Sequence, residues 1–92
     1  MSCAPRATLV IVAYGQSDLV EALLDSIVDH TPEAHEVLVV DNASPDDTYE
    51  RVQRHRSQPR VVRSGRNLGY GGGANLGVRA SNSEIVVIMN SD

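Results

Sequence analysis

The chain has 92 residues, of which 41% are hydrophobic and 22% are charged, and its formal net charge is −4. This length fits one small domain or part of a larger one, and the negative charge gives no reason to expect a nucleic-acid partner. The single cysteine, Cys3, allows neither an internal disulfide nor a thiolate metal cluster. The longest apolar runs are too short to cross a bilayer. We therefore expect a cytoplasmic protein, with the inner face of a membrane as an alternative place for a longer form.

Four apolar blocks predict β-strands, at residues 8–13, 36–41, 61–62 and 84–89. Continuous runs rich in Val and Ile are typical of strands that are covered on both faces, as in a parallel sheet. The third block is short and flanked by arginines, which favours an edge strand.

Helices are expected between these strands. The first follows Ser17-Asp18, carries one apolar stripe, and should end near His30. The second should begin at Ser44-Pro45-Asp46-Asp47, with Ser44 as its N-cap. The third should run from about Gly72 to Ser81.

The alternation of strands and helices with short connections predicts right-handed crossovers and a mostly parallel sheet. The fold class is therefore α/β, a Rossmann-like three-layer α/β/α arrangement. Asp41 and Asp92 both follow strands, so we expect them at one edge of the sheet, beside Ala13 and Tyr14. That edge is where open α/β sheets bind ligands.

Asp41 is the first candidate ligand-binding residue. Its carboxylate could accept a hydrogen bond from a nucleobase imide N–H or a ribose hydroxyl. For the neighbouring Asn42 and Ser44 we favour a structural role, in which they satisfy turn amides and cap a helix.

The densest signal is the glycine-rich segment from Asn67 to Gly77. Three consecutive glycines favour either close backbone approach to an anion at a helix N-terminus or tight packing of a helix on the sheet. Both alternatives stay open for the glycines. Asn67 and Asn75 are candidates for side-chain hydrogen bonds to a ligand or to the loop.

The last strand leads into Asn90-Ser91-Asp92. Oxygen ligands on such a turn suit Mg²⁺ or Mn²⁺ that is shared with substrate phosphates. The arginines between residues 51 and 66 most simply form a solvated flank, and neither Arg63 nor Arg66 is favoured as a phosphate ligand.

Two other classes are considered. Residues 69–74 formally fit a G-x-G-x-x-A dinucleotide fingerprint, with Asp92 at a suitable distance for NAD or FAD. Against this, residues 64–68 separate the glycines from the predicted strand at residues 61–62, and a dinucleotide site of this kind gives Asp41 no role in binding. The other class is a non-catalytic nucleotide-binding module, whose open sheet edge would permit self-association.

Four motifs in order resemble the N-terminal half of family 2 glycosyltransferases with the GT-A fold, particularly the rhamnosyltransferase-like branch. They lie at residues 10–14, 39–44, 67–77 and 88–92, with the sequences VIVAY, VVDNAS, NLGYGGGANLG and IMNSD. The resemblance spans residues 8–92 and leaves residues 1–7 as an N-terminal tail.

The resemblance implies a donor site for a nucleotide-diphosphate sugar and an inverting transfer of the sugar to an acceptor hydroxyl. The backbone around Ala13 and Tyr14 would flank the base, and Asp41 would bind base or ribose. The glycine-rich segment would shape the nucleotide pocket, and its implied nucleotide-binding residues are Asn67, Gly69, Gly73 and Asn75. Asp92 would bind Mg²⁺ or Mn²⁺, with Asn90 in place of the first acid of the Asp-x-Asp element.

In this family the general base and the acceptor-binding region lie downstream of the metal element. We therefore expect no catalytic base within these 92 residues, and little or no sugar transfer by the chain alone. The acceptor of a full-length protein would be a glycan or a lipid-linked glycan.

Overall fold

The computed structural model of the chain describes residues 7–30, 35–81 and 83–90. Within these residues, strands and helices alternate along the whole chain. They are β1 (Ala7–Ala13), α1 (Ser17–His30), β2 (His35–Asp41), α2 (Thr48–Gln53), β3 (Arg60–Arg63), α3 (Gly69–Ala80) and β4 (Ile85–Asn90). None of these helices combines the length and the apolarity that a membrane span needs.

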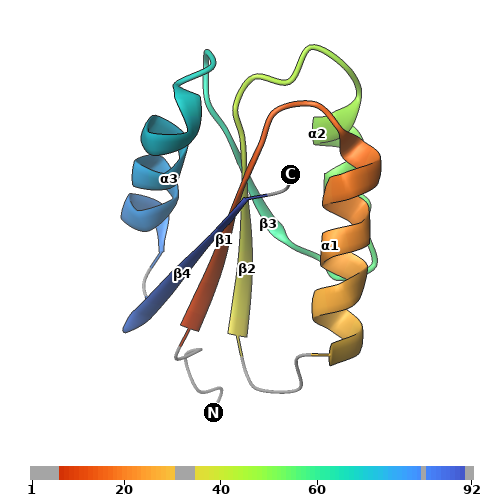
Figure 1. Cartoon of the computed structure of the whole chain (residues 1–92), viewed down its shortest axis with the longest axis vertical. Helices are drawn as coiled ribbons and strands as arrows, with labels where there is room; N and C mark the ends of the chain where they lie inside the picture. The colour runs from red at the N-terminus through yellow and green to blue at the C-terminus, as the bar shows by residue number, and fades with distance from the viewer. Residues whose placement is uncertain (1–6, 31–34, 82, 91–92) are drawn as a thin grey trace.

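The four strands form one sheet in the order β3-β2-β1-β4, and every pair is parallel. Helices α1 and α2 lie on one face of the sheet and α3 lies on the other (Figure 1). The predicted α/β class with three layers is therefore confirmed.

Each face of the sheet has its own apolar core, because side chains alternate along a strand. On the side of α1, Ile11 and Val39 pack with Leu24 and Val52 of the helices. On the side of α3, Val10, Leu38 and Val40 form a smaller cluster. A chain without Phe or Trp fills both cores with aliphatic residues.

Glycines let α3 lie close to the sheet. A Cβ at Gly73 would come within 2.7 Å of Val12 Cγ1, and a Cβ at Gly77 would overlap Val10 and lie 3.2 Å from Val40 Cγ2. Both residues are buried. At these two positions the geometry supports the packing alternative.

Two helices begin at other residues than the sequence predicts. Helix α2 begins at Thr48 rather than at Ser44, because the Ser44 hydroxyl has partners outside this helix. Helix α3 begins at Gly69 rather than near Gly72, so the three consecutive glycines lie inside its first turns. Side chains of Asn42 and Asn67 bind the backbone N–H groups of Leu68 and Gly69 and fix that start.

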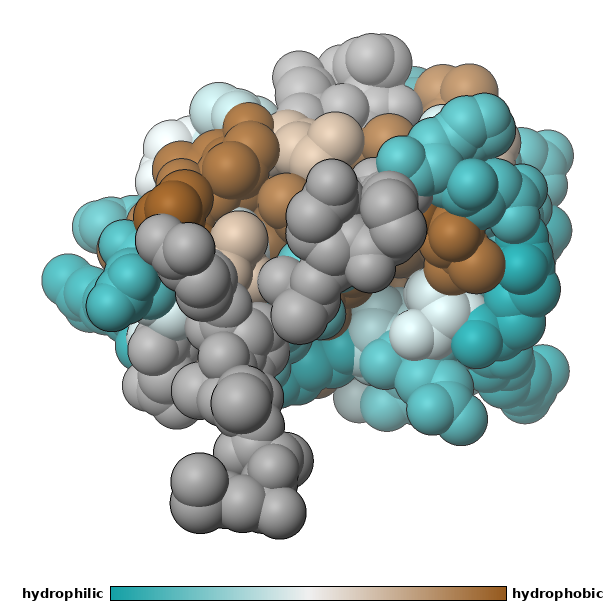
Figure 2. Space-filling view, turned by 90° about the horizontal axis from the view of Figure 1, so that it is seen from below, coloured by the Kyte–Doolittle hydropathy of each residue, from teal (hydrophilic) through white to brown (hydrophobic). Residues whose placement is uncertain are grey.

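Strand β4 is an edge strand of the described sheet, and it exposes apolar side chains. Ile85 is 49% exposed, Val87 42% and Ile88 40%. Seen from the end at which the strands begin, hydrophobic surface is broadest at the upper left of the view, and the right side is mostly hydrophilic with smaller hydrophobic patches (Figure 2).

Candidate functional site

The carboxyl ends of the strands meet at one edge of the sheet, as predicted. Ala13 is paired with Asp41 and Asp41 with Arg63, while Val12 is paired with the backbone of Asn90. The end of β4 thus lies beside the end of β1, and the end of β2 lies on the other side of β1. Asp92 lies outside the described residues, and so does the side chain of Asn90; their assignment as metal ligands stays a prediction.

Asp41 is the most buried charged residue of this edge, with 1% of its surface exposed. Its Oδ1 accepts a hydrogen bond from Ser44 Oγ, and its Oδ2 lies 3.4 Å from both Ser44 N and Arg63 Nε. A buried carboxylate needs such partners because the loss of hydration is costly. The fixed orientation is what a ligand-binding carboxylate requires, and its role towards a base or ribose stays a prediction.

Ser44 connects two loops of this edge. Its Oγ accepts a hydrogen bond from Gly15 N at 2.8 Å and donates to Asp41. Gly15 has a φ of +66°, a conformation that favours glycine. The prediction that Ser44 caps α2 is therefore wrong: its hydroxyl joins the turn after β1 to the end of β2.

Asp46 supplies the polar group near the start of α2 instead. Its Oδ1 accepts hydrogen bonds from the hydroxyl and the backbone N–H of Thr48. These bonds stabilise the charged form and hold the pKa of Asp46 below its usual range. Asp46 thus accepts a hydrogen bond from a backbone N–H at the start of α2, which is the role that the sequence had predicted for Ser44.

Asn42 is buried at 2% exposure and connects three segments. Its Oδ1 accepts from Leu68 N and from Ser64 Oγ, both at 3.1 Å, and its Nδ2 donates to the Gly69 carbonyl at 2.8 Å. The predicted structural role is confirmed, but its partners lie 22 to 27 residues away rather than in the local turn.

The remaining predicted nucleotide-binding residues differ in their surroundings. Ala13 is buried and Tyr14 is 51% exposed at the end of β1. Asn67 Oδ1 accepts from Gly69 N at 2.8 Å, and Gly69 has a φ of +74°. Gly73 faces the sheet, whereas Asn75 lies on the exposed side of α3. Their contact with a nucleotide stays a prediction, and for Gly73 that contact would be made by backbone alone.

Sequence reasoning missed Arg63 as a member of this edge. Besides its contact with Asp41, its Nη2 donates to the Ser44 carbonyl at 3.3 Å, and its guanidinium carbon lies 5.0 Å from the centre of the Tyr49 ring. The available signal in the sequence was that Arg63 directly follows the predicted strand at residues 61–62, and the structure pairs it with Asp41 at the end of β2.

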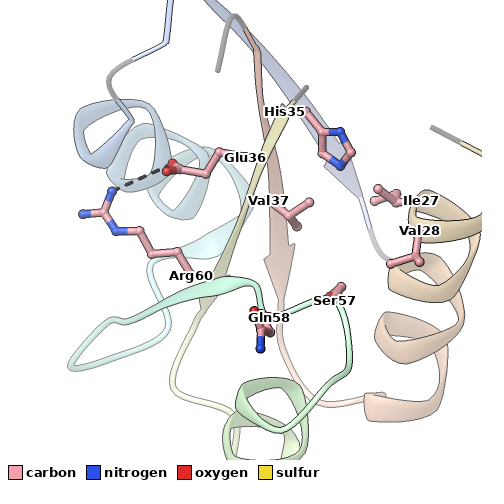
Figure 3. Close-up of a pocket in the computed structure, with 8 residues that line it drawn as sticks. All are labelled: Ile27, Val28, His35, Glu36, Val37, Ser57, Gln58 and Arg60. Atoms are coloured by element: carbon pink, nitrogen blue, oxygen red, sulfur yellow. Dashed lines mark ion pairs between the residues drawn. The ribbon is translucent and has the colours of Figure 1, made fainter. Parts of the chain in front are cut away.

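A separate hollow lies at the other end of the sheet. It has a volume of about 540 Å³ and is lined by Ile27, Val28, His35, Glu36, Val37, Ser57, Gln58 and Arg60 (Figure 3). The ion pair drawn there joins Arg60 Nη1 and Glu36 Oε1 at 3.9 Å. These residues come from the end of α1, the turn before β3 and the beginnings of β2 and β3, so this hollow is distinct from the predicted ligand edge.

Charged residues link α1 to the turn before β3. His55 Nε2 lies 2.9 Å from Asp25 Oδ1, and Arg56 binds Asp25 and Asp29 at 3.1 and 3.2 Å. Ser57 N donates to His55 Nδ1, so Nε2 carries the proton that bonds Asp25. The hydrogen bond from His55, helped by Arg56, holds the pKa of Asp25 below its usual range.

The family model described as "Glycosyl transferase family 2" matches residues 8–92. The chain belongs to this family. The resemblance to family 2 glycosyltransferases that the motifs predicted is thereby confirmed, whereas the rhamnosyltransferase-like branch stays a prediction.

Two curated relatives match nearly the whole chain. The succinoglycan biosynthesis protein ExoO of Rhizobium meliloti is 30% identical over 89 residues, which are 96% of this chain and 26% of that protein. An uncharacterized glycosyltransferase of Mycobacterium tuberculosis is 35% identical over 85 residues, 92% of this chain and 36% of that protein. The chain thus spans about a quarter to a third of these relatives.

Solved structures show the same fold. A mannosyltransferase from Pyrobaculum calidifontis, in complex with GDP-Man and Mn²⁺, is 32% identical with a TM-score of 0.85, over 99% of this chain and 28% of that one. Glucosyl-3-phosphoglycerate synthase from Mycobacterium tuberculosis, in complex with Mn²⁺, uridine diphosphate and glucosyl-3-phosphoglycerate, is 28% identical with a TM-score of 0.79, over 96% of this chain and 34% of that one.

Proposed function

We propose that residues 8–92 form the donor-binding part of a glycosyltransferase that transfers a sugar from a nucleotide-diphosphate sugar to an acceptor hydroxyl with inversion. The observation that carries this proposal is the carboxyl edge of the sheet. There the buried Asp41 carboxylate is held by Ser44 and Arg63, beside the turn after β1 and the start of α3. Relatives with the same fold hold GDP-Man or uridine diphosphate together with Mn²⁺.

The metal would be Mg²⁺ or Mn²⁺, held by Asp92 with Asn90 beside it. One carboxylate and one amide suit a cation that takes its other ligands from phosphates and water. Both proposed ligand side chains lie outside the part of the chain that the structure describes, and the described residues by themselves contain no group of three His, Cys, Asp or Glu that could hold a metal ion. When bound, this cation would neutralise charge on the leaving diphosphate.

The residues of the chain itself would bind and orient the donor. In this proposal the polar network around Asp41 presents fixed acceptors to base or ribose, so little reorganisation is needed on binding. The acceptor would be a glycan or a lipid-linked glycan, and the site would face the cytoplasm, including the inner face of a membrane. No residue of the chain is assigned as the general base.

Binding of uridine, deoxythymidine and guanosine diphosphates and of NAD, measured by calorimetry with and without Mn²⁺, tests the proposal. We expect the diphosphates to bind only with Mn²⁺, and Asp92→Asn to weaken that binding at least about tenfold by removing the charged ligand. Asp29→Asn, an equal charge change on α1, is the control. Binding of NAD in preference, or no diphosphate binding at all, would refute the donor site.

We also propose that the isolated chain associates with a second copy of itself. The outer edge of β4 and its exposed Ile85, Val87 and Ile88 favour edge-to-edge association. Light scattering after size exclusion should give a dimer mass that Val87→Lys reduces to the monomer mass. A monomer at high concentration would contradict this association.

A further inference from the structure

Arg63 is a charged group that is both fixed and accessible. Its side chain is 44% exposed, whereas the carboxylate it contacts is buried. Nε faces Asp41 Oδ2, Nη2 donates to the Ser44 carbonyl, and the Tyr49 ring lies beside the guanidinium. A guanidinium has five N–H donors in a rigid plane. Three of them are free of these contacts and are held in a defined orientation.

The sheet register places Arg63 at one end of a row. The row runs from Arg63 on β3 through Asp41 on β2 and Ala13 on β1 to the end of β4. Neighbouring strands lie about 4.8 Å apart, so the ends of β3 and β4 are separated by roughly 14 Å. A nucleoside diphosphate laid along this row spans a similar length, with its diphosphate at one end and its base at the other.

The proposed function sets the direction of the nucleotide, and the inference rests on it. The metal element follows β4, so the diphosphate belongs at that end of the row. The ribose then lies near the end of β1, and the base extends from the turn after β1 over the end of β2 towards β3. An arginine at that position is too far from the phosphates to bind them.

We propose that Arg63 is a specificity-determining residue of the donor site, which donates hydrogen bonds to a carbonyl group on the nucleobase. The contacts with Asp41, Ser44 and Tyr49 hold the guanidinium in place before the base arrives. The donor would therefore carry a keto base, that is, uracil, thymine or guanine.

The chemistry of base edges explains this selection. Uracil and thymine present the O4 acceptor, and guanine presents O6 beside N7, the pair of acceptors that a guanidinium fork fits. Cytosine and adenine carry an amino group at the corresponding position, which turns a donor towards a donor. A donor that faces another donor leaves both unpaired, and this costs more than a missing bond.

The experiment compares two pairs of ligands that differ at this group and at the adjacent ring nitrogen, with the 2-amino group of guanine as a further difference in the purine pair. Calorimetry with Mn²⁺ measures the binding of uridine against cytidine diphosphate, and of guanosine against adenosine diphosphate, to the 92-residue chain. We expect the keto member of at least one pair to bind about tenfold or more tightly than its amino partner. Arg63→Gln should lower that ratio towards one, mainly by weakening the keto ligand.

Two further variants separate recognition from folding and from general charge. Arg63→Lys keeps a cation beside Asp41 but loses the planar fork, so it should fold and still show a reduced ratio. Arg54→Gln removes the same charge from an exposed position at the end of α2 and should leave the ratio unchanged.

The outcomes distinguish this inference from the proposed function. If no diphosphate binds with Mn²⁺, the proposed function fails and this inference fails with it. If diphosphates bind but the wild type does not discriminate keto from amino bases, or if both Arg63 variants keep the wild-type ratio, only the role of Arg63 is refuted.

Discussion

The two ends of the sheet differ in how their polar groups are organised. At the carboxyl end, Asp41, Asn42, Ser44 and Ser64 are buried, and every one of them is hydrogen-bonded to a neighbouring loop. At the amino end lies a hollow of about 540 Å³, in which the ion pair between Glu36 and Arg60 is long and partly exposed. The difference shows that fixed, converging polar groups are concentrated at the carboxyl end, and for that reason we place the candidate site there rather than in the hollow.

The first prediction concerns the buried hydrogen bonds at the carboxyl end of the sheet. Asn42→Ala removes the acceptor of Leu68 N and the donor to the Gly69 carbonyl. Because buried groups that lose their partners are costly, the free energy of unfolding should fall by about 2–4 kcal/mol. Urea denaturation measures the change. Asn75→Ala, on the exposed side of α3, should stay within about 0.5 kcal/mol of the wild type. Equal effects of the two variants would contradict the role of Asn42.

The second prediction concerns the close packing that supports this end. Gly73→Ala places a Cβ within 2.7 Å of Val12 Cγ1 and 3.0 Å of Asn42 Nδ2. The helix must shift, and we expect a loss of about 1–3 kcal/mol in the free energy of unfolding. Gly71→Ala is the matched control, because its Cβ meets open space. Alanine there should stabilise the helix by up to about 1 kcal/mol. A neutral Gly73→Ala variant would show that α3 is not held by this contact.

The third and smallest effect concerns the charged contacts next to the amino end. The pKa of Asp25 lies below its usual range because His55, and then Arg56, favour the charged form. The folded state therefore binds this proton less readily than the unfolded state. The contribution is present above about pH 4 and is lost as the pH falls through the lower pKa of the folded state.

This effect is measured by urea denaturation between about pH 6 and pH 3. The stability difference between the wild type and Asp25→Asn should be present at pH 6 and shrink below about pH 4. We expect it to be small, because the side chain is exposed at 49%. A difference that does not change with pH would argue against the contact between Asp25 and His55.

The elements with strong local signals were predicted well. The apolar runs at residues 8–13 and 36–41 lie within or nearly coincide with β1 and β2, and α1 ends at His30 as predicted. The two helix starts were wrong because distant residues decide them. Ser44 is engaged by Gly15, and α3 begins where Asn42 binds Leu68. Local sequence does not contain contacts made across 26 or 29 residues.

The candidate site was predicted in the same uneven way. The carboxyl ends of parallel strands meet at one edge of a sheet, and this rule alone predicted that Asp41 lies beside the turn after Ala13. The strand register, in which Ala13 pairs with Asp41, confirms this position. The roles of Ser44 and Arg63 depend on which loops meet in space. Asp92, the other half of the prediction, lies outside the described residues.

The central claim is that the carboxyl edge, and not the hollow at the amino end, binds a nucleoside diphosphate with a divalent cation. Residue-resolved ¹H–¹⁵N NMR of the chain, titrated with uridine or guanosine diphosphate and Mg²⁺, tests it most directly. Amide shifts should concentrate at Tyr14, Asp41 to Ser44, Arg63 and Leu68, and be absent at Val28, His35 and Arg60. Shifts centred on those last three residues, or no shifts at saturating nucleotide, would contradict the account.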